Sequence, residues 1–272
     1  MYITKDLLML NFPKTGSTFS REVLRRVYSK RDTFIEKTLV KLGLRKPSVI
    51  DLLLPQLDIG MGTGLTNQHG MVRQIPEIYQ DRPIVTITRN PLSRYVSTYL
   101  FRSWVDFPPA DEQTLKKAYP NYPDLTFSEY YEMMHTYEVP TRLDGIKPKI
   151  ELGVFTIQFI RFYFKDPEAI LKKIDLEYIE NKEYMNELSN IHFIKQENLN
   201  SDLKEFLQSV GMTKDELSFM DSMDKINVSK QQEEKSNFKQ YYTGTDVEQK
   251  VLDRERLLFS IFPDYLPENE IK

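Results

Sequence analysis

Short apolar blocks alternate with helix-like periodicity along the first part of the chain. Leu7–Asn11 is a compact apolar run, which is typical of a buried strand. The segment Gly16–Lys30 follows it. Its apolar side chains Phe19, Val23 and Val27 recur every four residues, which is the spacing of one face of a helix. A buried strand that leads directly into a helix predicts a layered α/β fold.

The same alternation continues along the rest of the chain. A strand is expected near Leu65–Gln68, and another over Ile84–Thr88 leads into a helix that Asn90 can cap and Pro91 can begin. The further expected elements are helices around Val154–Phe164 and Pro167–Lys173, a strand at Ile191–Lys195, a helix from Leu199 that ends before Gly211, and a helix over Val247–Ile261. This order predicts a central parallel sheet flanked by helices, in a single domain over residues 1–272.

Residues 105–150 break the alternation, because they are rich in proline, tyrosine, phenylalanine and acidic side chains. We interpret the segment as an insertion rather than as a scaffold element. Its aromatic side chains suit a sugar or phenolic ligand, and they suit a local apolar core equally well, so both interpretations stay open. The residues concerned are Tyr119, Tyr122, Phe127, Tyr130, Tyr131 and Tyr137.

Composition narrows the classes of protein to which the chain can belong. Its 272 residues carry 37 Lys and Arg against 40 Asp and Glu, a net charge of -3, so binding to nucleic acid through bulk charge is not expected. The sequence has no cysteine, which excludes thiol catalysis, thiolate-bound zinc and disulfides. No apolar run reaches the roughly 18 residues that a membrane-spanning helix needs. A cytoplasmic protein without a membrane segment is therefore expected.

The first candidate site is the segment Pro13-Lys14-Thr15-Gly16-Ser17-Thr18, where the first strand passes into the first helix. A turn containing glycine at a helix N-terminus presents backbone N–H groups and the positive end of the helix dipole, which together bind phosphate or sulfate. The hydroxyls of Thr15, Ser17 and Thr18 add donors, and Lys14 adds a charge. An alternative is an ordinary helix start capped by Ser17 or Thr18. The triphosphate-binding pattern G-x-x-x-x-G-K-[ST] is absent, because the lysine precedes the glycine.

The second candidate site is the segment from Arg89 to Ser97. Arg89 ends the strand over residues 84–88, and Ser97 lies two turns into the following helix. Because helical side chains lean toward the N-terminus, Ser97 can face the same anion as Arg89. Arginine binds phosphate with two parallel hydrogen bonds, and serine supplies a neutral donor. The alternative is an arginine paired with a carboxylate and a serine on the helix surface.

Three histidines could act as a base, and they are His69, His135 and His192. His192 alternates within a strand-like segment, and His135 lies in the irregular segment 105–150. His69 follows the strand near Leu65–Gln68, and ligands of parallel sheets collect at the carboxyl ends of the strands. His69 is therefore the candidate general base beside Lys14 and Arg89.

These segments resemble the sulfotransferases that use 3′-phosphoadenosine 5′-phosphosulfate (PAPS). PKTGST matches the family's 5′-phosphosulfate loop P-K-[ST]-G-[ST]-[ST], and RNPLSRYVS matches its 3′-phosphate motif R-[ND]-P followed by R-x-x-S. The resemblance implies a P-loop-like sulfotransferase architecture in which residues 14–18 bind the 5′-phosphosulfate and Arg89 and Ser97 bind the 3′-phosphate. It also implies a late loop over the nucleotide, for which Lys230, Lys235 and Lys239 are the candidate contacts. The family's K-T-H segment and R-K-G segment have no complete counterpart here.

The resemblance implies transfer of a sulfuryl group from PAPS to an acceptor hydroxyl or amine, with PAP as the product. Lys14 and His69 would be the catalytic residues, a small molecule or a glycan the acceptor, and residues 105–150 the acceptor side. A monoanionic sulfuryl group carries less charge than a terminal phosphoryl group, so no metal is expected. Two other functions stay open: a small-molecule kinase with an unusual phosphate loop, and a non-catalytic module that binds PAP or a sulfated glycan.

Overall fold

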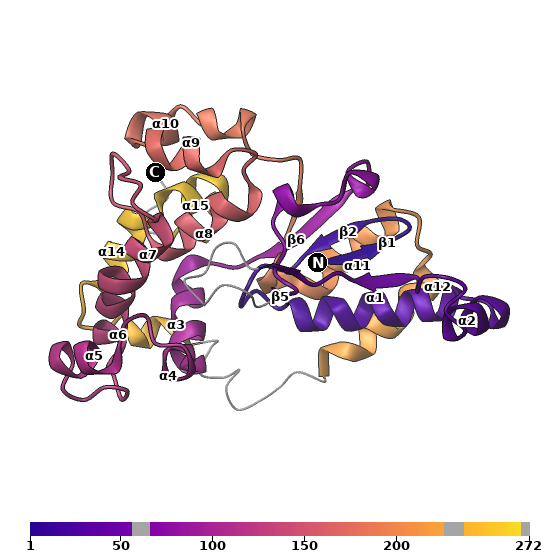
Figure 1. Cartoon of the computed structure of the whole chain (residues 1–272), viewed down its shortest axis with the longest axis horizontal. Coiled ribbons are helices and arrows are strands. Elements are labelled where there is room, and N and C mark those ends of the chain that lie inside the picture. The colour runs from indigo at the N-terminus through magenta and orange to yellow at the C-terminus, as the bar shows by residue number, and fades with distance from the viewer. Residues whose placement is uncertain (56–65, 226–236, 268–272) are drawn as a thin grey trace. The chain divides into compact units, whose positions relative to one another are not determined.

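The computed structural model describes residues 1–55, 66–225 and 237–267. The chain divides into two compact units, which are described separately (Figure 1). The sheet unit comprises residues 1–56, 64–89 and 190–229, and the helical unit comprises residues 57–63, 90–189 and 230–272. The assignment of residues 1–272 to one sulfotransferase domain stays a prediction.

A five-stranded mixed sheet is the framework of the sheet unit, with the strand order β3-β1-β2-β6-β7. Its strands are β1 (Tyr2–Thr4), β2 (Leu8–Leu10), β3 (Val49–Asp51), β6 (Ile84–Thr88) and β7 (His192–Lys195). β6 pairs in parallel with both β2 and β7, whereas β1 runs antiparallel to both β2 and β3. The α/β class is confirmed, but the expectation of a wholly parallel sheet is wrong. The connection from β1 to β2 is too short for the crossover that a parallel neighbour requires.

The helices α1 (Ser17–Arg31) and α11 (Leu199–Ser209) share one apolar core with the sheet. The helix predicted over residues 16–30 and the strand predicted over residues 84–88 are confirmed. The other elements of the sheet unit are α2 (Phe34–Lys41), β4 (Leu54–Pro55), β5 (Thr66–Asn67), α12 (Lys214–Leu217) and the 3-10 helices η1 (Val72–Gln74), η2 (Glu77–Tyr79), η5 (Gln196–Asn198) and η6 (Ser218–Lys225).

The helical unit is organised around α8 (Val154–Tyr163), in which every residue is buried. Because α8 has no exposed face, other parts of the protein pack against it on every side. The helices predicted at residues 154–164 and 167–173 are confirmed. The other elements of the helical unit are α3 (Pro91–Phe101), α4 (Ser103–Asp106), α5 (Glu112–Ala118), α6 (Phe127–Met133), η3 (Met134–Glu138), α7 (Val139–Leu143), α9 (Pro167–Lys173), α10 (Leu176–Glu180), η4 (Glu183–Asn186), η7 (Phe238–Tyr241), α14 (Val247–Arg254), α15 (Arg256–Ile261) and η8 (Pro263–Tyr265).

Residues 105–150 are largely helical, so the expectation of irregular structure there is wrong. That the segment is an insertion stays a prediction. Its polar residues act as helix caps: the Asp111 side chain accepts from the N–H of Thr114, and the Thr126 side chain accepts from the N–H of Glu129. The local-core interpretation of its aromatic residues is confirmed for four of them, which are at most 8% exposed. These are Tyr122, Phe127, Tyr130 and Tyr131. An acceptor-binding role for the segment stays a prediction.

Glu255 divides the C-terminal helix that was predicted as one element over residues 247–261. Its carboxylate is fully buried and accepts hydrogen bonds from the N–H groups of Phe155 (3.1 Å) and Thr156 (2.6 Å) and from the Tyr95 hydroxyl (2.6 Å). It thereby caps the N-terminus of α8, whose first amides have no partner within the helix. Gly153 leaves the space for this carboxylate, because a Cβ at residue 153 would collide with it.

His135 is enclosed by two tyrosine rings in the helical unit. Its ring centroid lies 6.0 Å from that of Tyr95 and 4.1 Å from that of Tyr131, and its Nδ1 is 2.9 Å from the Tyr131 carbonyl oxygen. Burial lowers the pKa of His135 to about 4. A histidine in the unfolded chain has a pKa of about 6.5, so the neutral ring stabilises the fold above that pH. This contribution is lost as the pH falls toward the folded pKa.

We expect His135→Gln to make the stability of the protein less sensitive to acid. Titration of His135 should lower the free energy of unfolding of the parent by up to about 3 kcal/mol between neutral pH and the folded pKa, whereas a glutamine amide stays neutral throughout. Urea unfolding at neutral and acidic pH measures the difference. His192→Gln is the matched control, because His192 is exposed on β7. An acid sensitivity that is the same in His135→Gln and in the parent would contradict the assignment.

Candidate functional site

The turn between β2 and α1 contains two residues in the left-handed conformation. Lys14 has a φ of 65° and Gly16 a φ of 99°. Glycine adopts this conformation without strain, and a Cβ at residue 16 would also approach Leu199 Cδ2 to 3.1 Å. The Thr15 hydroxyl donates to the Phe12 carbonyl oxygen at 2.9 Å and closes the turn from inside. Thr15 can therefore contribute its backbone N–H, rather than its hydroxyl hydrogen, to a ligand.

The N-terminus of α1 has no side-chain cap. Its N-cap residue is Gly16, and both Ser17 and Thr18 lie within the helix, so the alternative of a cap by either hydroxyl is wrong. By comparison, the Thr33 side chain at the start of α2 accepts from the N–H of Glu36. The first amides of α1 are thus presented at a turn whose glycine adds no side chain. This is the arrangement that favours an anion at a helix N-terminus.

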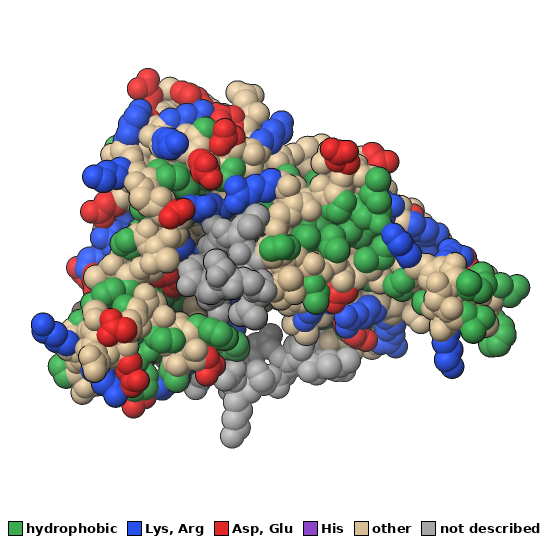
Figure 2. Space-filling model, in the orientation of Figure 1, with side chains coloured by type: hydrophobic (Ala, Val, Ile, Leu, Met, Phe, Trp, Pro, Cys, Tyr) green, Lys and Arg blue, Asp and Glu red, His purple; other side chains and the backbone are tan. Residues whose placement is uncertain are grey.

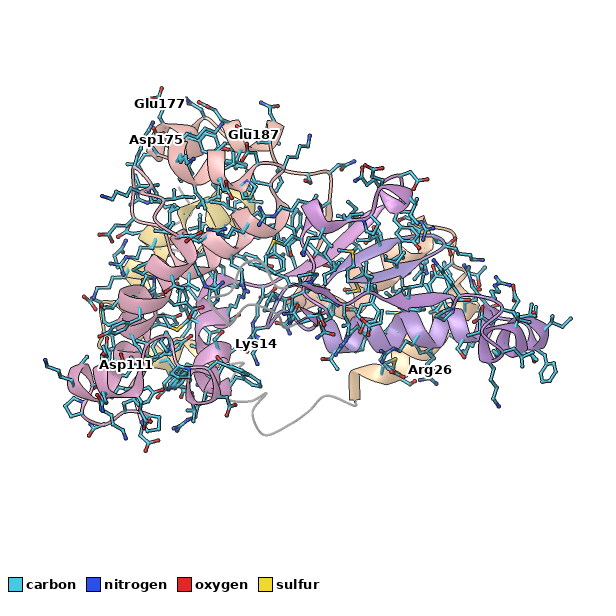
Figure 3. All side chains as sticks on the ribbon, in the orientation of Figure 1. Lys14, Arg26, Asp111, Asp175, Glu177 and Glu187 are labelled. Atoms are coloured by element: carbon cyan, nitrogen blue, oxygen red, sulfur yellow. The ribbon has the colours of Figure 1, made fainter. Side chains whose placement is uncertain are left out.

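Arg89 reaches the same turn from the neighbouring strand. β2 and β6 are parallel, with Leu10 opposite Thr86, so their carboxyl ends lie at one edge of the sheet. Arg89 follows β6, and its Nη1 lies 3.5 Å from the Lys14 carbonyl oxygen, at the long limit of a hydrogen bond. Lys14 is labelled in Figure 3. The structure therefore brings together both cationic residues that the sequence predicted for this edge.

His69 reaches the turn by a different route from the one expected. The strand near residues 65–68 is β5, which pairs antiparallel with β4 in a separate two-stranded sheet, so His69 does not end a strand of the main sheet. Residue 65 lies outside the described residues. The His69 N–H donates to Asn67 Oδ1 at 2.7 Å, and His69 Nδ1 lies 2.8 Å from the carbonyl oxygen of Asn11, directly after β2. A tertiary hydrogen bond thus places the imidazole at the sheet edge.

The contact with Asn11 selects the tautomer of the neutral His69 ring. A carbonyl oxygen can only accept, so Nδ1 carries the hydrogen of this bond. In the neutral ring the acceptor lone pair is then on Nε2. The Asn11 backbone therefore orients the imidazole as a base that acts through Nε2.

The residues that hold the segment around His69 in place belong to none of the predicted motifs. Asn11 is fully buried, and its Nδ2 lies 3.4 Å from the carbonyl oxygen of Gln68. The Gln68 side chain in turn accepts from Arg21 of α1, which also donates to Thr18 Oγ1 at 3.3 Å. The sequence does contain one indication of these contacts: an asparagine, Asn11, lies between a buried strand and a glycine turn. A polar side chain in such a position needs a hydrogen-bond partner.

Ser97 and Lys230 are predicted ligand contacts that do not belong to this turn. Ser97 is 5% exposed on α3 and belongs to the helical unit, whereas Arg89 belongs to the sheet unit. The same helix carries the buried Arg94, whose guanidinium lies 4.1 Å from the centroid of the Phe155 ring. A shared phosphate contact of Arg89 and Ser97 stays a prediction. Lys230 lies outside the described residues.

No group of three or more histidine or acidic side chains in the described ranges is arranged to hold a metal ion. No helix in the same ranges combines the length and the apolar character needed to cross a membrane. The absence of a metal from the reaction stays a prediction.

No protein-family model matches the chain, and no curated protein matches it. The chain's own motifs and the geometry around Lys14 are therefore the basis for its proposed function.

Proposed function

We propose that this chain is a sulfotransferase that transfers a sulfuryl group from PAPS to an acceptor hydroxyl or amine. The observation that carries the proposal is the glycine turn at the uncapped start of α1, to which β2 delivers Lys14. Arg89 and His69 also reach this turn through contacts with Lys14 and Asn11. A donor-rich turn with a cation and an oriented imidazole suits group transfer from an anionic donor.

Different groups of residues are proposed for the two ends of PAPS. The amides of residues 15–18 and the Lys14 ammonium suit the 5′-phosphosulfate, because both present positive charge to its oxygens. Arg89 is proposed for the 3′-phosphate, together with Ser97 of the helical unit, on the motif resemblance. Lys230 of the late loop is proposed as a further contact on the same basis.

The proposed reaction needs a proton acceptor and a group that stabilises the leaving oxygen. The acceptor oxygen or nitrogen forms a bond to sulfur while the bond from sulfur to the bridging phosphate oxygen breaks. His69 Nε2 takes the acceptor's proton as the new bond forms. Lys14 stabilises the negative charge that develops on the bridging oxygen. PAPS supplies the sulfuryl group, and PAP is released.

Two measurements test the two halves of this proposal. Radiolabelled PAPS offered to glycan, phenol, alcohol, amine and peptide acceptors should label at least one acceptor class without added metal. PAP should bind the parent, and Arg89→Ala should weaken that binding by about 10- to 100-fold, because a charge-assisted contact to phosphate is lost. Ser97→Ala should weaken it less.

The controls distinguish recognition of the 3′-phosphate by Arg89 from a general loss of structure in the variant. Adenosine 5′-phosphosulfate lacks the 3′-phosphate, so Arg89→Ala should change its affinity little. Arg25→Ala is the matched variant, because Arg25 is an exposed arginine of α1 that contacts Asp51 and the Tyr2 ring. Equal loss of affinity for both ligands would show that Arg89 does not read the 3′-phosphate. Magnesium-dependent turnover of ATP would identify a kinase, and tight PAP binding without transfer to any acceptor would identify a binding module.

A further inference from the structure

The helix α2 carries large apolar side chains that the sheet unit does not cover. None of its residues is buried. Phe34 is 85% exposed and Ile35 70%, and just after the helix Leu42 is 66% and Leu44 73% exposed. We call these four residues the α2 apolar face. Figure 2 shows hydrophobic side chains gathered at the end of the sheet unit where Figure 1 labels α2.

Local hydrogen bonds give this segment a defined shape without core packing. Thr33 and Glu36 form a reciprocal capping box at the start of α2. At its end, the N–H of Leu44 donates to the Leu39 carbonyl oxygen at 2.9 Å across Gly43, whose φ is 72°. The exposed apolar side chains therefore project from an ordered helix and turn.

The charges around the α2 apolar face are predominantly positive. Residues 33–46 contain Lys37, Lys41, Arg45 and Lys46, and their single acid is Glu36. Glu36 forms an ion pair with Arg45, and it also accepts from the Thr33 N–H at 2.8 Å. Within the described residues, no acidic partner is recorded for the three lysines, all of which are exposed. A net positive charge therefore remains beside the exposed apolar side chains.

One of the exposed apolar side chains, Phe34, lies on the same side of α2 as two lysines. Phe34, Lys37 and Lys41 are spaced at i, i+3 and i+7, so they share one stripe of the helix. A second copy of this chain would bring like charges together at such a surface. The interface of an anionic bilayer accepts both kinds of side chain, because apolar groups enter the acyl boundary while lysines reach the lipid phosphates.

We infer that the α2 apolar face and its lysines dock the sheet unit onto the surface of an anionic lipid bilayer. The docking is peripheral, since α2 is far shorter than a membrane span. The inference rests on this surface alone and does not depend on the proposed transferase activity.

The test uses the full chain and vesicles of phosphatidylcholine with and without phosphatidylserine. The parent should sediment with vesicles that contain phosphatidylserine, bind pure phosphatidylcholine more weakly, and dissociate as salt is raised. Replacing both Phe34 and Ile35 with serine should lower partitioning at least about tenfold, since two large apolar side chains no longer insert. Lys37→Gln and Lys41→Gln should each lower it about fivefold.

A matched control is available in the same unit. Ile78 of η2 is 71% exposed but stands beside Glu77 and near Asp81, so Ile78→Ser should leave vesicle binding unchanged. Thermal unfolding of every variant should match the parent, because the substituted residues are exposed. Equal binding by the parent and the Phe34/Ile35 double variant, or no binding to phosphatidylserine vesicles, would overturn the inference. A parent dimer that the double variant dissociates would assign the face to a second copy and would also overturn it.

Discussion

Lys14→Ala should lower the rate of sulfuryl transfer by about 10²–10³ while changing the affinity for PAP much less. The Lys14 charge matters most when the bridging oxygen becomes negative, and loss of one such contact in a transition state typically costs this much. Lys14 lies in the turn that Gly16 and the start of α1 complete, so its side chain starts beside the proposed phosphosulfate position. Single-turnover transfer and PAP titration, measured on the same preparations, separate the two effects.

The controls for Lys14 test charge and folding separately. Lys14→Gln keeps most of the side-chain length without the charge, and it should be about as slow as Lys14→Ala. Lys5→Ala removes an exposed lysine from the connection between β1 and β2, and it should retain the parent rate. Transfer by Lys14→Ala at the parent rate would remove Lys14 from the mechanism.

His69→Asn should abolish most of the transfer and leave the affinity for PAP nearly unchanged. A positioned general base contributes about 10²–10⁴ to a rate, and asparagine cannot accept the acceptor's proton. The contact of His69 Nδ1 with the Asn11 carbonyl leaves Nε2 as the basic atom of the neutral ring. The measurement is steady-state transfer to whichever acceptor the labelling panel identifies, with PAP binding measured in parallel.

His192→Asn is the matched control for this variant, since His192 is exposed on β7. It should keep the parent rate. A fully active His69→Asn enzyme would move the base to the helical unit, where His135, Glu129 and Glu132 are the alternatives. Glu129 belongs to the capping box of α6, and Glu132 pairs with Lys250 at 2.6 Å. His135 lies between two tyrosine rings. Each of these side chains would therefore have to give up its present contact before it could accept the acceptor's proton.

Much of the local structure could be predicted from the sequence. The strand over residues 84–88, the Asn90 cap with Pro91 at the first helical position, and the helix that begins after Gly16 all follow from neighbouring residues. These features depend on periodicity, capping and backbone conformation, which act over a few residues. The sequence predicts least well over residues 105–150, because capping residues are also common in loops and tyrosines suit both a core and a ligand surface.

The candidate site shows the same division between local and distant contacts. The glycine turn and its lysine follow from residues 13–18 alone, and the placement of Arg89 follows from one strand end. The position of His69 does not, because it depends on a hydrogen bond to Asn11 across 58 residues of chain. The division of the last helix depends likewise on Glu255 and the amides of α8, about 100 residues away in the sequence.

The sequence by itself determined the α/β class, the glycine turn before α1 and the cationic residues at the sheet edge. Tertiary structure alone decided that β1 joins the sheet antiparallel, that His69 approaches from a separate two-stranded sheet, and that the aromatic segment packs as a core. The physical reason is the range of the interactions. Backbone propensity and capping are set by adjacent residues, whereas strand partners and buried polar contacts are chosen among groups that only folding brings together.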